Sequence, residues 1–336
     1  MSKEEIEYMA IGENTMEIQL FNTQTSKPSI FQSGYIEGAK LIGADVFGEK
    51  GKYGEGVKVA IIDTGCDVNH PNLKDRIINV RNFTTDDKGS INNVTDYVGH
   101  GTATASVIGA SDIGEHGIIG VAPKCDLMIL KALTRSGGKN SWVTEAIKYA
   151  TSHNVDIINM SLGSVEPNAE MYEAIKRAIS KEICIVVACG NNSDNNVNTN
   201  ELNYPASYNE CISVGSISYS RKYSRFSASN NEIDLATFGE GLNGRGILTC
   251  YPNGLYKEQK GTSFSAPFVS GSLALLKNWF RDEFGRDCTQ EELYAQLIRR
   301  TYDVGINRRI VGNGALYLPL TTDFNYIELI DNVLKG

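Results

Sequence analysis

The stretch Val57-Lys58-Val59-Ala60-Ile61-Ile62-Asp63-Thr64-Gly65 sets the fold class of this chain. It is a short run rich in β-branched residues that ends at a polar turn, which is typical of a buried strand. Similar strand patterns lie at 127–130, 155–160 and 183–188, and helix-like segments lie at 102–110, 142–153 and 169–180. Strands that are apolar on both faces and alternate with helices indicate a parallel sheet covered on both sides. We therefore predict an α/β fold: a three-layer, doubly wound, mostly parallel sheet with helices on both faces.

Polar residues follow the ends of three of these predicted strands. Asp63, Ser161 and Asn191 each come directly after or at the end of an apolar run. In open parallel sheets the active site forms outside the carboxyl ends of the strands. The three residues are therefore candidates for one shared site.

Composition excludes several classes of function. The chain has 336 residues and a net charge of −8, which argues against nucleic acid or an anionic membrane as a partner. No run approaches the length of a membrane span, and the charged start Met1-Ser2-Lys3-Glu4-Glu5 is not a secretory signal. The seven cysteines are scattered without zinc-ligand or disulfide spacing, so we expect buried reduced thiols. These features predict a cytoplasmic protein.

A second stretch, Gly261-Thr262-Ser263-Phe264-Ser265-Ala266-Pro267, places a serine just before a long apolar helical pattern. A serine at a helix start lies beside unpaired amide donors and the positive end of the helix dipole. Both favour the negative charge that develops in acyl transfer. The same pattern also fits a loop followed by an N-cap. Ser263 is a candidate nucleophile if the chain also supplies a base and a residue that orients it.

His100 is the best candidate for that base among the four histidines. It lies in Gly99-His100-Gly101-Thr102, and glycine neighbours let the ring approach a substrate backbone closely. The other three have structural explanations: His70 in a turn, His116 in a glycine-rich loop and His153 near a helix end.

Asp63 ends a predicted buried strand, where a carboxylate requires a partner. It is either a cap or turn residue, or the group that fixes the tautomer of His100 and stabilises its imidazolium. The order along the chain is then Asp63, His100, Ser263. Three local patterns in one consistent order are more specific than any one of them alone.

The blocks at 63–65, 100–102 and 261–267 resemble the three catalytic blocks of the subtilisin-like serine proteases, and the similarity runs from about Val57 to Arg300. The resemblance implies the subtilisin-like fold and a serine endopeptidase that cleaves peptides or proteins through an acyl-enzyme, with no cofactor required for the chemistry. It also implies that Asn191 donates its side-chain amide to the oxyanion together with the backbone N–H of Ser263, with Asn192 as the rival. The positions that match the family's substrate cleft are Ser161, Leu162, Gly163, Ala188, Gly190 and Asn203.

The family's calcium sites are only partly retained. At the tight site the usual aspartate is replaced by Asn72, and the loop at 111–117 has few oxygen ligands, so we expect no calcium there. A second family site matches Asp234 with the backbone carbonyls of Ala206 and Tyr208. These groups either hold a structural calcium ion or leave Asp234 as a solvated loop carboxylate.

Three segments resemble the intracellular subtilisins of Gram-positive bacteria: Asp63-Thr64-Gly65-Cys66-Asp67, 295–300 and 312–314. The predicted cytoplasmic location fits the same group. Those proteases are typically homodimers and carry a short N-terminal extension that blocks the active site until it is clipped. Met16-Glu17-Ile18-Gln19-Leu20-Phe21-Asn22 occupies the matching place, with Asn22 where the family has a proline. We predict an inhibitory N-terminal extension (1–32), a catalytic domain (33–319) and a C-terminal tail (320–336).

Two biological roles fit this resemblance: bulk turnover of intracellular protein, or dedicated maturation of one peptide or proprotein. Ala103 and Phe268 stand where the family usually has histidine, which leaves room for the second role. A hypothesis from another class is a non-catalytic homologue that only holds peptides. Such proteins usually lose a triad member, and none is missing here.

Overall fold

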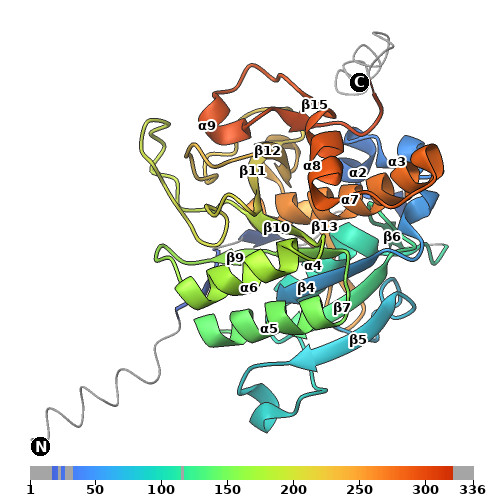
Figure 1. Cartoon of the computed structure of the whole chain (residues 1–336), viewed down its shortest axis with the longest axis vertical. Helices are drawn as coiled ribbons and strands as arrows, with labels where there is room; N and C mark the ends of the chain where they lie inside the picture. The colour runs from blue at the N-terminus through green and yellow to red at the C-terminus, as the bar shows by residue number, and fades with distance from the viewer. Residues whose placement is uncertain (1–16, 22–23, 27–32, 115–116, 321–336) are drawn as a thin grey trace, which may run out of the picture.

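The computed structural model describes residues 17–21, 24–26, 33–114 and 117–320. Within these residues the centre is a nine-stranded sheet with the order β15-β16-β12-β11-β10-β8-β4-β7-β5 (Figure 1). Neighbouring strands run parallel, except that β15 is antiparallel to β16. The predicted fold class, a mostly parallel α/β sheet, is confirmed.

The strands of this sheet are β4 (Lys58–Asp63), β5 (Ile77–Asn82), β7 (Asp126–Lys131), β8 (Ile157–Met160), β10 (Cys184–Ala188), β11 (Ile212–Ser218), β12 (Leu235–Glu240), β15 (Thr301–Tyr302) and β16 (Ala315–Leu316). The helices are α2 (Glu37–Leu41), α3 (Ala44–Phe47), α4 (His100–Gly109), α5 (Asn140–Ser152), α6 (Ala169–Ile179), α7 (Thr262–Phe284), α8 (Gln290–Ile298) and α9 (Arg308–Val311). Smaller pairings join β1 (Gln19–Leu20) to β9 (Leu162–Gly163), β3 (Gly34–Tyr35) to β6 (Ile118–Ile119), and β2 (Gln24–Ser26) to the hairpin of β13 (Ile247–Tyr251) and β14 (Leu255–Lys260).

Two apolar cores lie on the two faces of the sheet, because side chains alternate along each strand. On β4, Ala60 and Ile62 belong to the core beneath α5 and α6, whereas Val59 and Ile61 belong to the core beneath α4 and α7. Full burial of one such aliphatic side chain contributes about 1.5–3 kcal/mol. Both faces of the sheet are therefore covered, as the unbroken apolar strands predicted.

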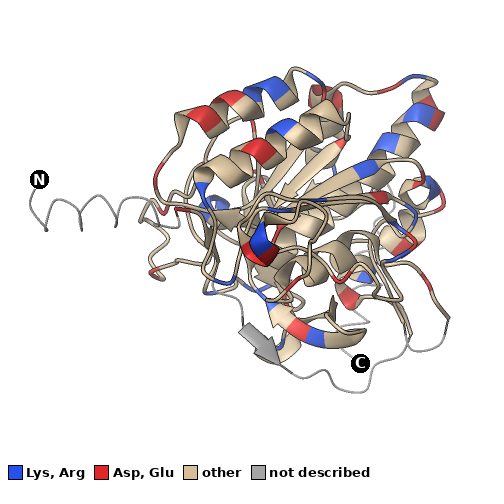
Figure 2. Cartoon of the chain, turned by 90° about the horizontal axis from the view of Figure 1, so that it is seen from below, with Lys and Arg blue, Asp and Glu red and all other residues tan. Residues whose placement is uncertain are grey.

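Most charged side chains lie outside this interior, and Asp63 and Lys131 are among the few that are buried. Figure 2 shows Lys, Arg, Asp and Glu mainly on the outer helices and loops, while the strands at the centre are largely uncharged. All seven cysteines are buried and free, so the prediction of buried reduced thiols is confirmed. In the described part of the chain no helix is long and apolar enough to cross a membrane.

The predicted N-terminal extension is described only in part. Its segments 17–21 and 24–26 contribute β1 and β2, and these pair with β9 and β14 of the segment 33–319. Met16, Asn22 and residues 321–336 of the predicted tail lie outside the described residues.

Candidate active site

Asp63 and His100 meet where β4 ends and α4 begins. Both side chains are 1% exposed, and His100 Nδ1 lies 2.7 Å from Asp63 Oδ1. The backbone N–H of Thr64 donates to the same oxygen at 2.7 Å. A carboxylate on Nδ1 selects the tautomer whose Nε2 is the basic atom. That Nε2 is buried and has no hydrogen-bond partner among the described residues.

The helix that carries His100 begins two residues before the segment 102–110 that the sequence pattern predicted. Gly99 adopts a left-handed φ of 88° as its N-cap, so His100 is the first helical residue. A Cβ at Gly101 would lie 2.1 Å from the carbonyl oxygen of Gly65. Glycine there allows the helix to approach the turn after Asp63 closely enough for the two side chains to meet.

Asp96 is a positioning residue that sequence reasoning missed. It is 5% exposed. Its Oδ1 accepts from Thr64 Oγ1 at 2.9 Å and from the N–H of Gly99 at 2.7 Å, while Oδ2 accepts from Thr102 N–H and Oγ1 at 2.9 and 2.7 Å. It therefore ties the turn after Asp63 to the start of the His100 helix. An aspartate just before a helix start was the available signal, because a carboxylate is stabilised there.

Ser263 lies in the first turn of α7 and is fully buried. Its Oγ is 3.4 Å from the carbonyl oxygen of Ser161, a long contact. The ring of the next residue, Phe264, packs against the ring of His100 with centroids 5.5 Å apart. The helix start thus places the residue after Ser263 against the ring of His100.

The backbone of Ser263 is held in an unusual way. Pro267 lies inside α7, four residues further on, and a proline has no N–H for the carbonyl of residue i−4. Ser161 Oγ donates to that carbonyl oxygen instead, at 2.8 Å. A residue of the predicted substrate edge therefore also fixes the backbone that carries the nucleophile.

Asn191 lies directly beside this helix start. Its Oδ1 accepts from the N–H and the Oγ1 of Thr262, both at 2.8 Å. Because the oxygen end of the amide is fixed on Thr262, the other end, Nδ2, is the donor that an oxyanion would need. The rival Asn192 instead accepts from Asn203 Nδ2 at 2.9 Å, so its side-chain oxygen serves the loop.

The predicted substrate edge is paired with the extension. β1 runs antiparallel to β9 with Leu20 opposite Leu162, and Ile18 exchanges two backbone hydrogen bonds with Gly138, of 2.9 and 2.7 Å. Ile18 is 1% exposed. A Cβ at Gly163 would lie 2.6 Å from the ring of Phe21. Residues 17–21 therefore lie along the edge that the resemblance assigns to substrate.

The opposite wall of the predicted cleft is formed at the end of β10. Ala188 is buried, and Asn203 Nδ2 donates to the carbonyl of Cys189 at 2.9 Å. A Cβ at Gly190, which has φ of 121°, would lie 2.3 Å from that same nitrogen. Asn203 thus contacts the segment that leads to Asn191, and its place near the base of the pocket stays a prediction.

Cys66 lies close to Asp63 in sequence but is not poised for chemistry. The thiol is buried, and desolvation raises its pKa well above the ordinary value. A buried thiol that resists ionisation is a poor nucleophile. Its role is packing.

Asp234, the carboxylate of the predicted second calcium site, is held by protein hydrogen bonds. Its Oδ2 accepts from the N–H of Ser213 at 2.8 Å and its Oδ1 from the hydroxyl of Tyr294 at 2.6 Å, while the carbonyl of Tyr208 accepts from Cys211 N–H at 2.9 Å. Ala206 is 2% exposed. Protein donors thus already contact both carboxylate oxygens, and a calcium ion at this place stays a prediction. Burial raises the pKa of Asp234, so it is not a solvated loop carboxylate either.

Asn72 also serves packing. Its Nδ2 donates to the carbonyls of Ser111 and Ile118 at 2.8 and 2.9 Å, and its Oδ1 accepts from the hydroxyl of Tyr256 at 2.6 Å. An amide donor facing two carbonyls is the reverse of what a cation requires.

Comparisons with known proteins agree with this geometry. The model described as the subtilase family matches residues 54–314. The chain is 48% identical over 275 residues to the "Intracellular serine protease" of Paenibacillus polymyxa, covering 82% of each protein. It is 44% identical over 304 residues to the "Major intracellular serine protease" of Bacillus subtilis, covering 90% of this chain and 93% of the relative. It is 34% identical over 240 residues to "Subtilisin E" of the same species, covering 71% of this chain and 60% of the relative.

Proposed function

This chain belongs to the subtilase family and is a serine endopeptidase, and we propose that Asp63, His100, Ser263 and Asn191 carry its chemistry. The observation that supports this assignment best is the 2.7 Å contact between buried Asp63 and His100 Nδ1. It makes Nε2 of His100 the basic atom, and the His100 ring packs against Phe264 in the first turn of α7, next to Ser263. Peptides or proteins are the substrates.

In this mechanism His100 Nε2 takes the proton of Ser263 Oγ as that oxygen attacks the peptide carbonyl. Asp63 holds the orientation of His100 and stabilises the imidazolium that forms. Asn191 Nδ2 and the backbone N–H of Ser263 donate to the oxyanion. His100 then protonates the leaving amine, and water resolves the acyl-enzyme.

Labelling by a fluorophosphonate tests the nucleophile and separates an enzyme from a homologue that only holds peptides. We expect the wild-type chain to be labelled at Ser263 and to lose activity, and Ser263→Ala to do neither. Ser272→Ala, a buried serine of the same helix, serves as the control and should be labelled normally. Retained hydrolysis in a clean Ser263→Ala preparation would contradict the assignment.

Asn191 is tested by Asn191→Asp. This change retains an oxygen that can accept from Thr262 but replaces the Nδ2 donor by a charged oxygen. We expect kcat to fall about 100- to 1000-fold, the range found when such a donor is removed in a subtilisin, with KM much less affected. An unchanged kcat would exclude Asn191 from the oxyanion hole.

We further propose that the N-terminal extension masks the cleft. Supporting this, β1 pairs with the substrate edge β9, and the buried side chain of Ile18 anchors the segment. Ile18→Asp in the full-length chain should raise the initial rate of peptide cleavage. Val46→Asp, at a valine that is 51% exposed, should not. A chain beginning at Ser33 should cleave the peptide at least as fast as Ile18→Asp. Equal initial rates for the wild-type chain, Ile18→Asp and the chain beginning at Ser33 would contradict the proposal.

For the biological role we propose turnover of intracellular protein in the cytoplasm, supported by the word "intracellular" in the names of two relatives. Dedicated maturation of one peptide or proprotein is the alternative. Rapid digestion of casein favours turnover, whereas cleavage confined to a narrow peptide set favours maturation. A homodimer is proposed from the resemblance alone. Light scattering during size-exclusion chromatography measures the mass of the protein and so its oligomeric state.

A further inference from the structure

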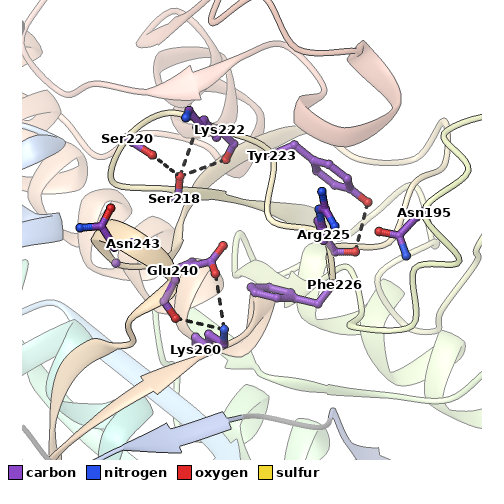
Figure 3. A pocket seen from close by; sticks show the side chains of 12 residues that line it. Asn195, Ser218, Ser220, Lys222, Tyr223, Arg225, Phe226, Glu240, Asn243 and Lys260 are labelled. Atoms are coloured by element: carbon purple, nitrogen blue, oxygen red, sulfur yellow. Dashed lines mark hydrogen bonds and ion pairs between the residues drawn. The ribbon is translucent and has the colours of Figure 1, made fainter.

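A large cavity lies beside the candidate active site and has no role in the chemistry described above. Its volume is about 930 Å³, and three cations and one carboxylate are among the residues that line it: Lys222, Arg225, Lys260 and Glu240. Figure 3 shows these side chains around the opening, with Phe226 between Arg225 and Lys260. The chain as a whole carries a net charge of −8, so a cluster with two excess positive charges is a local exception.

We propose that this cavity is a subsite for the leaving half of the substrate and that it selects a carboxylate there. The proposal rests on the proposed protease function. It adds a charge preference for the residues after the scissile bond. The predicted cleft, which is lined by uncharged residues, binds the residues before that bond.

The position of the cavity follows from the order of the sheet. Ser218 and Glu240, which line it, are at or near the carboxyl ends of β11 and β12. The substrate edge follows β8, and β10 with Asn191 lies between β8 and β11. The cavity is therefore on the far side of the oxyanion residue from the edge that holds the acyl half.

The extension indicates the path of a bound peptide. Its segment β1 pairs with β9, and its segment β2 pairs with β14, with Gln24 opposite Lys260. Lys260 precedes Ser263 by three residues and lines the cavity. A peptide that follows the same path places its acyl half on β9 and brings its leaving half to Lys260 and the cavity.

The cations are available for a ligand. Among the residues that the structure describes, the side chains of Lys222 and Arg225 have no hydrogen bond or ion pair, and both residues are exposed. Lys260 is already engaged: its Nζ donates to the carbonyl of Gly244 at 3.1 Å and lies 3.5 Å from Glu240. Lys222 and Arg225 therefore supply the two uncompensated charges.

The backbone that carries these two cations is held in place. Ser218 N–H donates to the carbonyl of Lys222 at 2.9 Å, and the hydroxyl of Tyr223 donates to the carbonyl of Ser227 at 3.1 Å. Tyr223 also bonds Ser193, two residues after Asn191, at 2.8 Å. A preorganised loop loses little freedom when a ligand binds, so its charges act efficiently.

The test measures the steady-state rate at which the full-length chain cleaves internally quenched peptides. All peptides have the same acyl half and an amidated C-terminus. The second and third residues after the scissile bond are Glu, Gln or Lys, and mass spectrometry verifies the cleaved bond. We expect kcat/KM for Glu to exceed that for Gln about tenfold at low ionic strength, with a smaller ratio at high salt. A second pair of peptides ends at the third residue after the scissile bond, one as the free acid and one as the amide. Comparing their rates shows whether the cavity selects a terminal carboxylate or a side-chain carboxylate.

Charge reversal makes the test specific. Lys222→Glu with Arg225→Glu should invert the order, so that the Lys peptides become the better substrates. Lys181→Glu, at an exposed lysine just after α6 and close to the amino end of β10, makes the same kind of change elsewhere and should keep the wild-type preference. Equal rates for Glu, Gln and free-acid peptides, or a preference that survives the reversal, would overturn the subsite. A wild-type protein that cleaves no peptide, whether full length or beginning at Ser33, would overturn the proposed function as well.

Discussion

Ser161→Ala should destabilise the chain more than the loss of one ordinary hydroxyl. Ser161 Oγ donates to the carbonyl oxygen of Ser263 at 2.8 Å, and Pro267 has no N–H to replace it. In the variant that oxygen becomes a buried acceptor without its donor. A buried polar group left in this state costs about 1–3 kcal/mol.

Ser272→Ala is the matched control for that magnitude. Both serines are fully buried, and Ser272 Oγ donates to the carbonyl of Phe268 at 2.8 Å. That carbonyl also faces the helical N–H of residue 272, which remains after the substitution. We therefore expect a loss below about 1 kcal/mol, the ordinary net value of one hydrogen bond.

The assay is equilibrium unfolding in urea, with every chain carrying Ser263→Ala so that self-digestion does not intervene. Pro267→Ala is the second perturbation, because it supplies the missing N–H to the carbonyl of residue 263. We expect the cost of Ser161→Ala to shrink by about 1 kcal/mol in the Pro267→Ala background, a coupling typical of groups that share a partner. Strictly additive changes, or equal costs for Ser161→Ala and Ser272→Ala, would refute the reasoning.

Three further outcomes follow from buried groups. Burial lowers the pKa of His70 below its ordinary 6.5, so as the pH falls the unfolded chain takes up a proton that the folded chain does not. We therefore expect the free energy of unfolding, measured by urea titration, to decrease from about pH 7 to pH 5. In His70→Gln it should decrease less. Because burial raises the pKa of the Cys66 thiol, iodoacetamide should leave Cys66 unlabelled in the folded protein at neutral pH, as mass spectrometry would show, and the rate of peptide cleavage should not change. Both carboxylate oxygens of Asp234 already accept hydrogen bonds, so added calcium should shift Tm equally in wild type and Asp234→Asn; a shift seen in wild type alone would assign an ion to this carboxylate.

Much of the architecture was predictable from local pattern, because strands that are apolar on both faces require a covered parallel sheet. The predicted strands at 127–130, 155–160 and 183–188 appear as β7, β8 and β10 with ends shifted by one or two residues. The helix predicted at 102–110 begins instead at His100, because the left-handed Gly99 caps it. Pattern indicated the element, and backbone geometry set its end.

The sequence by itself determined the chemistry on offer: an aspartate at a strand end, a histidine between glycines and a serine at a helix start, in one order along the chain. Only the tertiary structure decided how these groups are held. Asp96 accepts from Thr64 in the turn after Asp63 and so ties that turn to the His100 helix, and Ser161 replaces the donor that Pro267 lacks. It also gathered Lys222, Arg225 and Lys260 around one cavity. These contacts join residues that are distant in the chain, and no local periodicity records which distant donor meets which acceptor once the sheet has formed.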